Sequence, residues 1–220
     1  MLKQVGRMGT LALRLFGVLL VWQSWSVWAA PEDDFRAGSQ AFREGDVVQA
    51  MAVLKKSADA GHAPSQSLLA YILDKAEFNE EAIAYYRKAA AQGDKDGEFG
   101  LGSMYAAGEG VKRDPAEAHK WIARAAEKGH ATAINALAEA YIKGGLGIDE
   151  KQRSGAEALV WVRRAADSGY IPAMEQLAAA YRSGTYGLAV DSTQATALDA
   201  KIRAARGIAE KGAEKKKGRK

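Results

Sequence analysis

The chain has 220 residues, of which 48% are hydrophobic and 26% are charged, and its formal net charge is +4 at pH 7. This composition, with only four prolines, fits a helical globular protein. The absence of cysteine excludes disulfides, thiol catalysis and cysteine zinc sites, and it also removes the acceptor thiol of a lipoprotein.

Residues 1–29 have the features of a secretory signal peptide. Three basic residues accompany the apolar run Leu15–Trp22, and Val27 and Ala29 supply small side chains before a cleavage site. We therefore expect cleavage after Ala29 and a periplasmic location. Translation from Met8 would give a more compact signal. The alternative is an uncleaved membrane anchor, but the apolar run is well short of the ~20 residues that a spanning helix needs.

Helical patterns occupy the rest of the chain up to a basic tail. We place a polar lead-in at residues 30–36 and helical repeats at residues 37–207, with apolar residues from Phe35 to Phe42 beginning the first helix. Acidic residues before this helix favour its dipole. The first unit is expected to act as the N-terminal cap of a stack, because one side of a terminal repeat faces water.

The stretch Gly97–Gly129 shows the pattern of one unit most clearly. A first helix ends at Gly108, and a second is predicted to begin at Asp114, with Pro115 in the first helical position and Glu117 completing a capping box. Two glycines on the first helix permit close approach of a neighbouring backbone. The expected buried positions are Gly97, Leu101, Gly102, Tyr105, Ala118, Trp121, Ala125 and Ala126.

The same pattern recurs around four glycines. Gly61, Gly93, Gly129 and Gly169 lie 32, 36 and 40 residues apart, and small or apolar residues recur at fixed distances from them. A helix pair this short cannot bury its own apolar face, so neighbouring copies are expected to stack. The sequence therefore predicts an all-α solenoid of about five helix pairs.

Residues 101–129 read Leu-Gly-x-x-Tyr-x-x-Gly, then Gly-Val-x-x-Asp, then Ala-x-x-Trp-x-x-x-Ala-Ala-x-x-Gly. This pattern resembles the SEL-one-like (Sel1-like) repeat, a relative of the tetratricopeptide repeat. The resemblance covers about residues 35–207, although the two units before Gly93 have shorter turns and read more like plain tetratricopeptide repeats. It implies a right-handed superhelix of helix pairs that binds other proteins and has no catalytic residue.

Two longer loops, Gly144–Ser154 and Gly184–Asp191, contain spaced glycines. Neither follows a strand or precedes the Gly-Lys-Ser/Thr of a phosphate-binding loop, so both are interpreted as turns between paired helices. Trp121 and Trp161 hold identical repeat positions, which favours core packing over ligand stacking.

The three histidines do not suggest a metal site. His62 and His130 occur at the same register position, one per repeat, so we expect each to cap or pack at a junction between repeats. His119 is expected to be exposed. No metal ion and no cofactor is predicted.

The first helix of each pair is expected to line the concave face of the solenoid, where a partner would bind. Tyr71 and Phe99 are its candidate aromatic anchors, because exposed aromatic residues in a polar setting are typical binding hot spots. The alternative is that both rings pack between neighbouring helices. The predicted surface residues are Ser67, Tyr71, Asp74, Asp96, Phe99, Ser103, Asn135, Glu139, Ile142, Glu175 and Arg182.

Charge is concentrated at the two ends of the chain. The signal carries +3 and the tail, residues 208–220, carries +4, which leaves −3 for the repeats. A mildly acidic body argues against a nucleic-acid surface, which needs a basic stripe. The tail is expected to be disordered, and it is either solvated or a tether to anionic envelope lipid.

We therefore interpret the protein as a non-enzymatic periplasmic scaffold that binds protein partners of the cell envelope. Exported members of the family it resembles are similar to motor accessory proteins, sensor-kinase regulators and polysaccharide-export scaffolds, and the sequence does not choose between them. The alternative is a cell-wall glycan-binding or envelope enzyme-associated protein. That reading needs a carboxylate pair facing a closed pocket, and the sequence indicates none.

Overall fold

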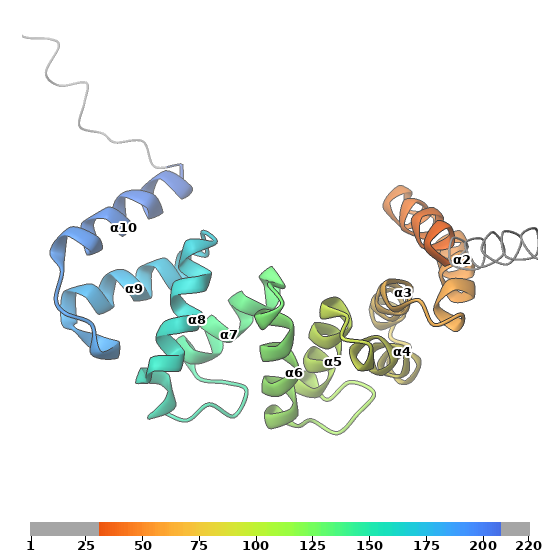
Figure 1. Ribbon diagram of the computed structural model, residues 1–220, viewed down its shortest axis with the longest axis horizontal. Helices are drawn as coiled ribbons and strands as arrows, with labels where there is room; N and C mark the ends of the chain where they lie inside the picture. Colours follow the sequence, from red (N-terminus) through yellow and green to blue (C-terminus); the bar gives the residue numbers. More distant parts are fainter. Residues whose placement is uncertain (1–30, 208–220) are drawn as a thin grey trace, which may run out of the picture. The chain divides into compact units, whose positions relative to one another are not determined.

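A computed structural model describes residues 31–207, whose regular structure is helical apart from one isolated β-bridge between Gly145 and Ile148. The chain divides into two compact units at the boundary between Gln92 and Gly93, and each unit is built from helices that follow one another in pairs (Figure 1). The predicted all-helical repeat fold is confirmed.

Unit 1 begins with a helical segment at residues 31–44. The lead-in predicted at residues 30–36 is therefore wrong for residues 31–36, which belong to the first helix. Ser57 Oγ donates a hydrogen bond to the Pro31 carbonyl at 2.6 Å and ties down this early start. Three further helices follow, and α3 packs against both of its neighbours. They are α2 (Val47–Asp59), α3 (Ala63–Lys75) and α4 (Asn79–Ala91).

Unit 2 contains three helix pairs, in which each helix packs against the next along the chain. Short 3₁₀ turns, η1 (Gln152–Ser154) and η2 (Thr185–Gly187), lie in the two long loops. The helices are α5 (Lys95–Ala107), α6 (Pro115–Glu127), α7 (Ala131–Lys143), α8 (Ala156–Asp167), α9 (Ile171–Ser183) and α10 (Ser192–Ala205).

Local sequence signals determine where these helices begin and end. Gly108, at φ 84°, ends α5 in the left-handed conformation that glycine adopts without strain. The Asp114 carboxylate accepts the amide protons of Ala116 and Glu117, which confirms the predicted N-cap of α6. The capping box is only half formed, because the amide of Asp114 donates to the Tyr105 carbonyl at 2.9 Å instead of to Glu117.

The core lies along the predicted repeat positions. Leu101, Leu137 and Leu177 are all at most 5% exposed, and the paired alanines near the ends of α4, α6 and α8 are buried as well. Gly102 permits a close approach of α6, because a Cβ added there would lie 2.7 Å from Ile122 Cγ1 and 3.1 Å from the Ala118 carbonyl oxygen. The prediction that small residues bring α5 and α6 together is confirmed.

Three expectations about single residues need correction. Trp161 is buried, but Trp121 is only half-buried, and its Nε1 donates to the Glu117 carboxylate. Tyr105, also expected in the core, is half-buried. His119 is half-buried rather than exposed, and its ring packs edge-on against Tyr141 with the ring centres 6.2 Å apart.

Candidate functional site

The candidate site is the set of predicted surface residues on the first helix of each pair, which we call the first-helix face. In unit 2 it comprises residues of α5, α7 and α9, and in unit 1 it comprises residues of α3. The two sets lie in separate compact units and are described separately.

On α5, the predicted residues Asp96 and Phe99 lie one helical turn apart and meet His130, the N-cap of α7. The Phe99 and His130 rings stack with centres 4.5 Å apart and planes at 24°. His130 Nε2 lies 3.2 Å from Asp96 Oδ1, while its Nδ1 accepts the amide proton of Ala133. The expected capping role of His130 is confirmed, and the stack leaves Phe99 partly exposed beside an exposed carboxylate.

On α7, Glu139 lies between two partners. Its carboxylate accepts a hydrogen bond from the Tyr170 hydroxyl at 3.0 Å and pairs with Lys143 at 2.6 Å. These hydrogen bonds, that of Lys143 above all, hold the pKa of the Glu139 carboxyl below its usual range. Tyr170 occupies the register position of His62 and His130, and in these three repeats the residue at this position contacts the preceding first helix.

On α9, the predicted residues Glu175 and Arg182 are exposed and form ion pairs with the last helical region. Glu175 pairs with Arg206 at 2.6 Å, and Arg182 pairs with Asp199 of α10. The remaining predicted residues of unit 2 are half-buried. Ser103 Oγ donates to the Phe99 carbonyl of its own helix, and the buried Asn135 Oδ1 has no hydrogen-bond partner within residues 31–207. Ile142 packs against the core.

In unit 1, the three predicted residues of α3 differ in exposure. Ser67 is only 4% exposed, so it does not belong to the surface on which it was placed. Asp74 is half-buried and lies 3.2 Å from Lys75. Tyr71 is 43% exposed, with its ring edge-on to Phe42 at 6.1 Å. Both readings of Tyr71 hold in part, because the ring packs against a neighbouring helix and still faces solvent.

A repeated cluster in unit 1 was not predicted. Glu32 Oε2 lies 3.2 Å from His62 Nε2, and the Phe35 ring lies 5.4 Å from the same imidazole. The acid and the aromatic residue are three positions apart, as Asp96 and Phe99 are. This spacing was visible in the sequence, but placing Glu32 in a lead-in instead of a helix concealed it.

The buried carboxylate of Glu98 was also missed. Glu98 is fully buried on α5, and its Oε1 pairs with Arg124 at 2.9 Å and with Lys128 at 2.8 Å. Lys128 Nζ also donates to the Gly93 carbonyl at 2.7 Å. Glu98 joins α5 to α6 within one repeat. The acidic residue gave no signal in the apolar pattern, because its partners belong to the other helix of the pair.

Within residues 31–207, no three His, Asp or Glu side chains gather as metal ligands, and no helix is long and apolar enough to cross a membrane. The signal, the tail and their predicted roles lie outside the described residues.

These features define a helical-repeat protein whose candidate site is a polar surface with partly exposed aromatic rings. The sequence model of the Sel1 repeat matches residues 79–94, 95–130, 131–170 and 171–198, more than half of the chain, and the chain therefore belongs to the Sel1 repeat family. The matched segments begin at α4, the second helix of the unit that ends at Gly93.

Solved structures support the fold. A Sel1 repeat protein from Oxalobacter formigenes superposes with a TM-score of 0.60 at 27% identity, covering 78% of this chain and 70% of that chain. A protective antigen of uropathogenic Escherichia coli that displays an SLR fold superposes with a TM-score of 0.51 at 24% identity, covering 84% of this chain and 48% of that chain.

Curated relatives match over shorter segments. The chain is 34% identical over 91 residues to DAP3-binding cell death enhancer 1 of Rattus norvegicus, which is 40% of this chain and 18% of that protein. It is 40% identical over 60 residues to chitin synthase regulatory factor 3 of Schizosaccharomyces pombe, which is 27% of this chain and 6% of that protein. The chain thus spans less than a fifth of the length of these relatives.

Proposed function

We propose that this protein is an exported scaffold that binds a protein partner of the cell envelope through the first-helix face of unit 2. Sel1 repeat proteins generally mediate protein–protein interactions, and the rat relative is named for binding another protein. The proposal of export rests on the signal-like sequence of residues 1–29.

The observation that carries the proposal is the Phe99–His130 stack. Stacking holds the Phe99 ring in one orientation before a partner arrives, so little side-chain entropy is lost on binding. Asp96 is exposed beside the ring and offers a carboxylate to a donor on the partner. A fixed aromatic ring within a polar rim is the arrangement of a binding hot spot.

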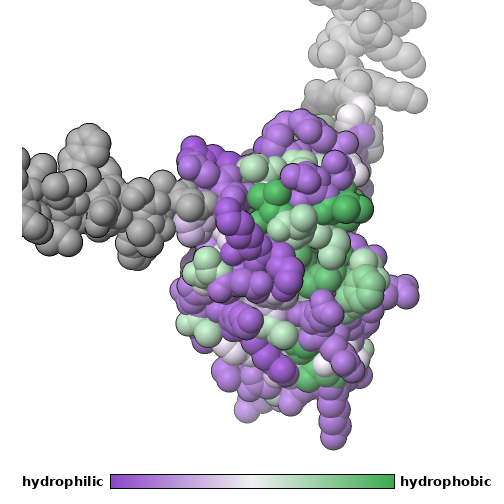
Figure 2. All heavy atoms as spheres, turned by 90° about the vertical axis from the view of Figure 1, so that its right-hand side faces the viewer, coloured by the Kyte–Doolittle hydropathy of each residue, from purple (hydrophilic) through white to green (hydrophobic). Residues whose placement is uncertain are grey.

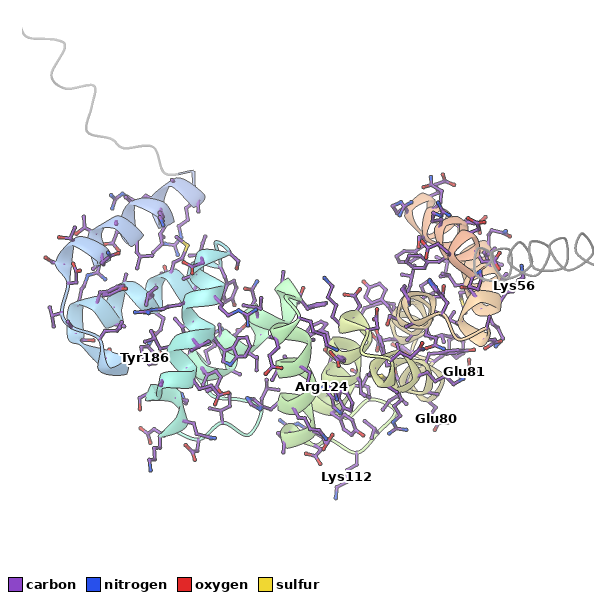
Figure 3. The ribbon with its side chains drawn as sticks, in the orientation of Figure 1. Lys56, Glu80, Glu81, Lys112, Arg124 and Tyr186 are labelled. Atoms are coloured by element: carbon purple, nitrogen blue, oxygen red, sulfur yellow. The ribbon has the colours of Figure 1, made fainter. Side chains whose placement is uncertain are left out.

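The test is site-specific photo-crosslinking in living cells, with the probe at Phe99 and, as a second site, at Tyr71. Lys112 lies in the exposed loop between α5 and α6 and serves as the control position (Figure 3). One dominant crosslinked protein from Phe99 but not from Lys112 is expected. Equal or absent crosslinking at all sites would reject this face as the interface, and binding to purified cell wall would then favour the glycan-binding alternative.

Export is tested separately by the intact mass of the mature protein. Cleavage after Ala29 predicts a chain that begins at Ala30. A mature mass that includes the first residues would reject cleavage and favour the membrane anchor.

The basic tail is proposed as a weaker contact with anionic lipid. Each basic residue near such a surface contributes ~1 kcal/mol at low salt. Deleting Lys211–Lys220 should therefore release the protein from membranes at low salt, whereas unchanged association would show that the tail is only solvated.

A further inference from the structure

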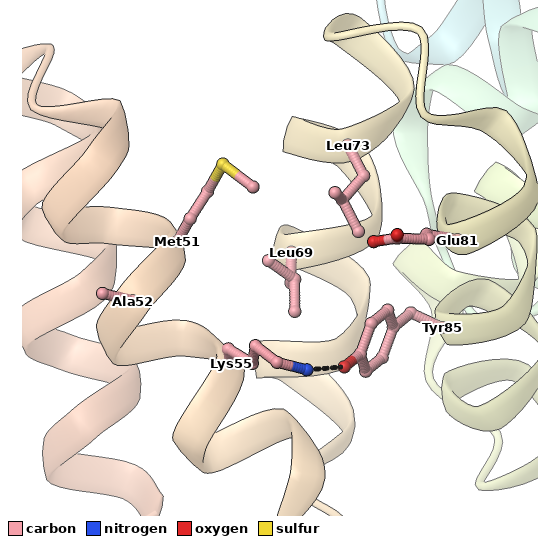
Figure 4. Close-up of a pocket in the computed structure, with 7 residues that line it drawn as sticks. All are labelled: Met51, Ala52, Lys55, Leu69, Leu73, Glu81 and Tyr85. Atoms are coloured by element: carbon pink, nitrogen blue, oxygen red, sulfur yellow. Dashed lines mark hydrogen bonds between the residues drawn. The ribbon is translucent and has the colours of Figure 1, made fainter.

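Unit 1 contains an open groove between α2 and α4, with α3 as its floor (Figure 4). Its volume is about 260 Å³. This is smaller than the ~300–1,000 Å³ of typical small-molecule sites, so the groove suits one or two side chains better than a whole ligand. The residues that line it are Met51, Ala52, Lys55, Leu69, Leu73, Glu81 and Tyr85.

The groove exists because the turn between α3 and α4 is short. Only residues 76–78 join these helices, whereas the corresponding loops in unit 2 are longer, residues 108–114, 144–155 and 184–191, the last two being the long loops. Each long loop places an apolar residue directly after a glycine, Ile148 and Leu188, and both of these side chains pack against the core of unit 2. A Cβ added at Gly147 would lie 3.7 Å from Pro115 Cβ, so this loop reaches the start of α6. In the short turn of unit 1, the apolar residue is Phe78, which is exposed instead of packed against a core.

Apolar side chains are exposed at the starts of α2 and α4. Val47 and Val48, at the start of α2, are 41% and 82% exposed, and Phe78, at the start of α4, is 56% exposed. Val48 shares a helical stripe with Ala52 and Lys55, which line the groove. Hydrophobic residues gather in a patch among hydrophilic ones on this part of the protein (Figure 2).

The two ends of the groove differ in charge. At one end, Lys55 Nζ donates to the Tyr85 hydroxyl at 3.1 Å, and that hydroxyl donates to Asp59 at 2.7 Å, so these charges compensate one another. At the other end, the Glu81 carboxylate points into the groove. Glu80, next to Glu81 in the first turn of α4, is exposed (Figure 3). Glu77, in the turn before α4, is exposed as well, so this end is acidic. The first-turn position by itself favours Glu80 and Glu81, but it does not explain why Glu81 lines an apolar groove.

We propose that this groove binds a loop of a partner protein that presents a branched apolar side chain next to a basic residue. The apolar side chain takes the place that Ile148 and Leu188 fill in unit 2, and the basic residue pairs with Glu81. This surface is distinct from the first-helix face, because Tyr71 is two residues from both Leu69 and Leu73 and therefore lies about 200° away around α3.

The test uses the full chain and a synthetic fluorescent peptide with the sequence of residues 144–154, in which Asp149→Lys and Glu150→Lys supply basic residues. Fluorescence anisotropy should show saturable binding of this peptide. The same peptide with Leu146→Asp and Ile148→Asp should bind at least tenfold more weakly. No saturation with the first peptide, or equal binding of the two, would overturn the proposal.

Two variants of the protein locate the site. Ala52 is exposed on the groove wall, so Ala52→Gln fills the groove without entering the core, and it should weaken peptide binding at least tenfold. Ala91→Gln, at the exposed end of α4 and outside the groove, is the matched control and should leave binding unchanged. Glu81→Lys should reverse the preference, so that the unmodified acidic peptide binds more tightly than the lysine peptide. Equal binding by the wild type and Ala52→Gln would overturn the assignment of the site.

Other occupants give different results. A dimer of the wild type that Ala52→Gln converts to a monomer in analytical ultracentrifugation would show that a second copy fills the groove, and it would overturn the proposal of a partner loop. Tenfold tighter peptide binding after removal of residues 1–29 would assign the groove to the chain's own N-terminal segment and would also overturn it. Crosslinking from Phe99 reports on the first-helix face alone, so the two proposals fail independently.

Discussion

Trp121 and Trp161 hold the same repeat position but lie in different surroundings. Trp161 is 5% exposed in the core of unit 2. Trp121 is half-buried, with the Arg124 guanidinium 4.6 Å from its ring centre, and its Nε1 donates to Glu117. Trp161→Ala is expected to cost ~3–5 kcal/mol of unfolding free energy because it opens a cavity, and Trp121→Ala is expected to cost less. Urea unfolding of both variants tests this, and equal losses would contradict it.

For the ion pairs of Glu98, the loss of stability should depend on which partner is removed. Its partners Arg124 and Lys128 have side chains 44% and 40% exposed, so water receives both if Glu98 is removed. Removing both cations instead leaves a buried charge unpaired. The double variant Arg124→Met with Lys128→Met is therefore expected to lose ~3–5 kcal/mol, measured by urea unfolding, whereas Glu98→Met loses clearly less.

The control for this pair is Lys120→Met, which removes an exposed cation that also lies over the Trp121 ring, at 5.5 Å. This variant should lose little, since exposed ion pairs contribute roughly 0–1 kcal/mol. If the double variant is as stable as Lys120→Met, the buried charge of Glu98 does not need Arg124 and Lys128 to be tolerated in the folded protein.

His130 predicts a dependence of stability on pH. Burial lowers the pKa of the imidazole from 6.5, and the attraction of Asp96 does not offset this, because Asp96 is 62% exposed and water screens it. The unfolded chain therefore takes up the proton at a higher pH than the folded chain. The stabilisation is complete above pH 6.5, and it is lost as the pH falls from there toward the folded pKa.

His130→Asn keeps an N-cap without a titrating group, so it should remove this part of the pH dependence. Melting temperatures of both proteins between about pH 5 and 8 give the comparison. Parallel curves for wild type and variant would rule out the lowered pKa of His130 as the cause.

At the scale of elements, the sequence predicted helices well where the signals were local. Asp114 with Pro115 marked the start of α6, and Gly108 marked the end of α5. Glu117 did not complete the capping box because the Asp114 amide bonds to Tyr105, a contact that depends on how the loop returns. Periodicity likewise did not reveal that Ser67 is buried.

The candidate site was less predictable than the helices. The register identified Phe99 and Asp96 correctly as neighbours on one helix, but only the structure shows that His130 joins them. The groove of unit 1 arises from residues that are missing from a turn. A pattern search for conserved positions within the repeat does not detect such a gap, although the difference in turn length was visible.

The caps of the second helices have a measurable effect. The carboxylates of Asp114 and Asp191 each accept two amide protons at the start of a helix. Asp114→Ala should destabilise the protein by about 1 kcal/mol, because two amide groups then lose their partner. Asp114→Asn keeps the acceptor and should lose less. Urea unfolding measures these losses. If Asp114→Ala has the same unfolding free energy as the wild type, water replaces the cap.

At the scale of the whole molecule, the two units differ in the loops that join the first helix of a pair to the second helix. Loops with a glycine and a following apolar residue complete the core of unit 2, and the short turn of unit 1 leaves that position open. The mild acidity of the repeats and the open groove favour the same kind of partner, one with basic and apolar residues together. In the two long loops, Ile148 and Leu188 pack against the core of unit 2, as expected of turns between paired helices.

Stability is expected to vary along the described chain as it does in other repeat arrays, where terminal repeats have one neighbour instead of two. The helix α10 packs mainly against α9 and buries only Ala195, Leu198 and Ile202, whereas α8 packs against both α7 and α9. Backbone amides of α10 should therefore exchange with deuterium at least tenfold faster than those of α8, because fewer contacts oppose local opening. Leu198→Ala should accelerate exchange in α10 and leave α8 unchanged. Equal rates in both helices, each raised by this variant, would show that the array opens as a single cooperative unit.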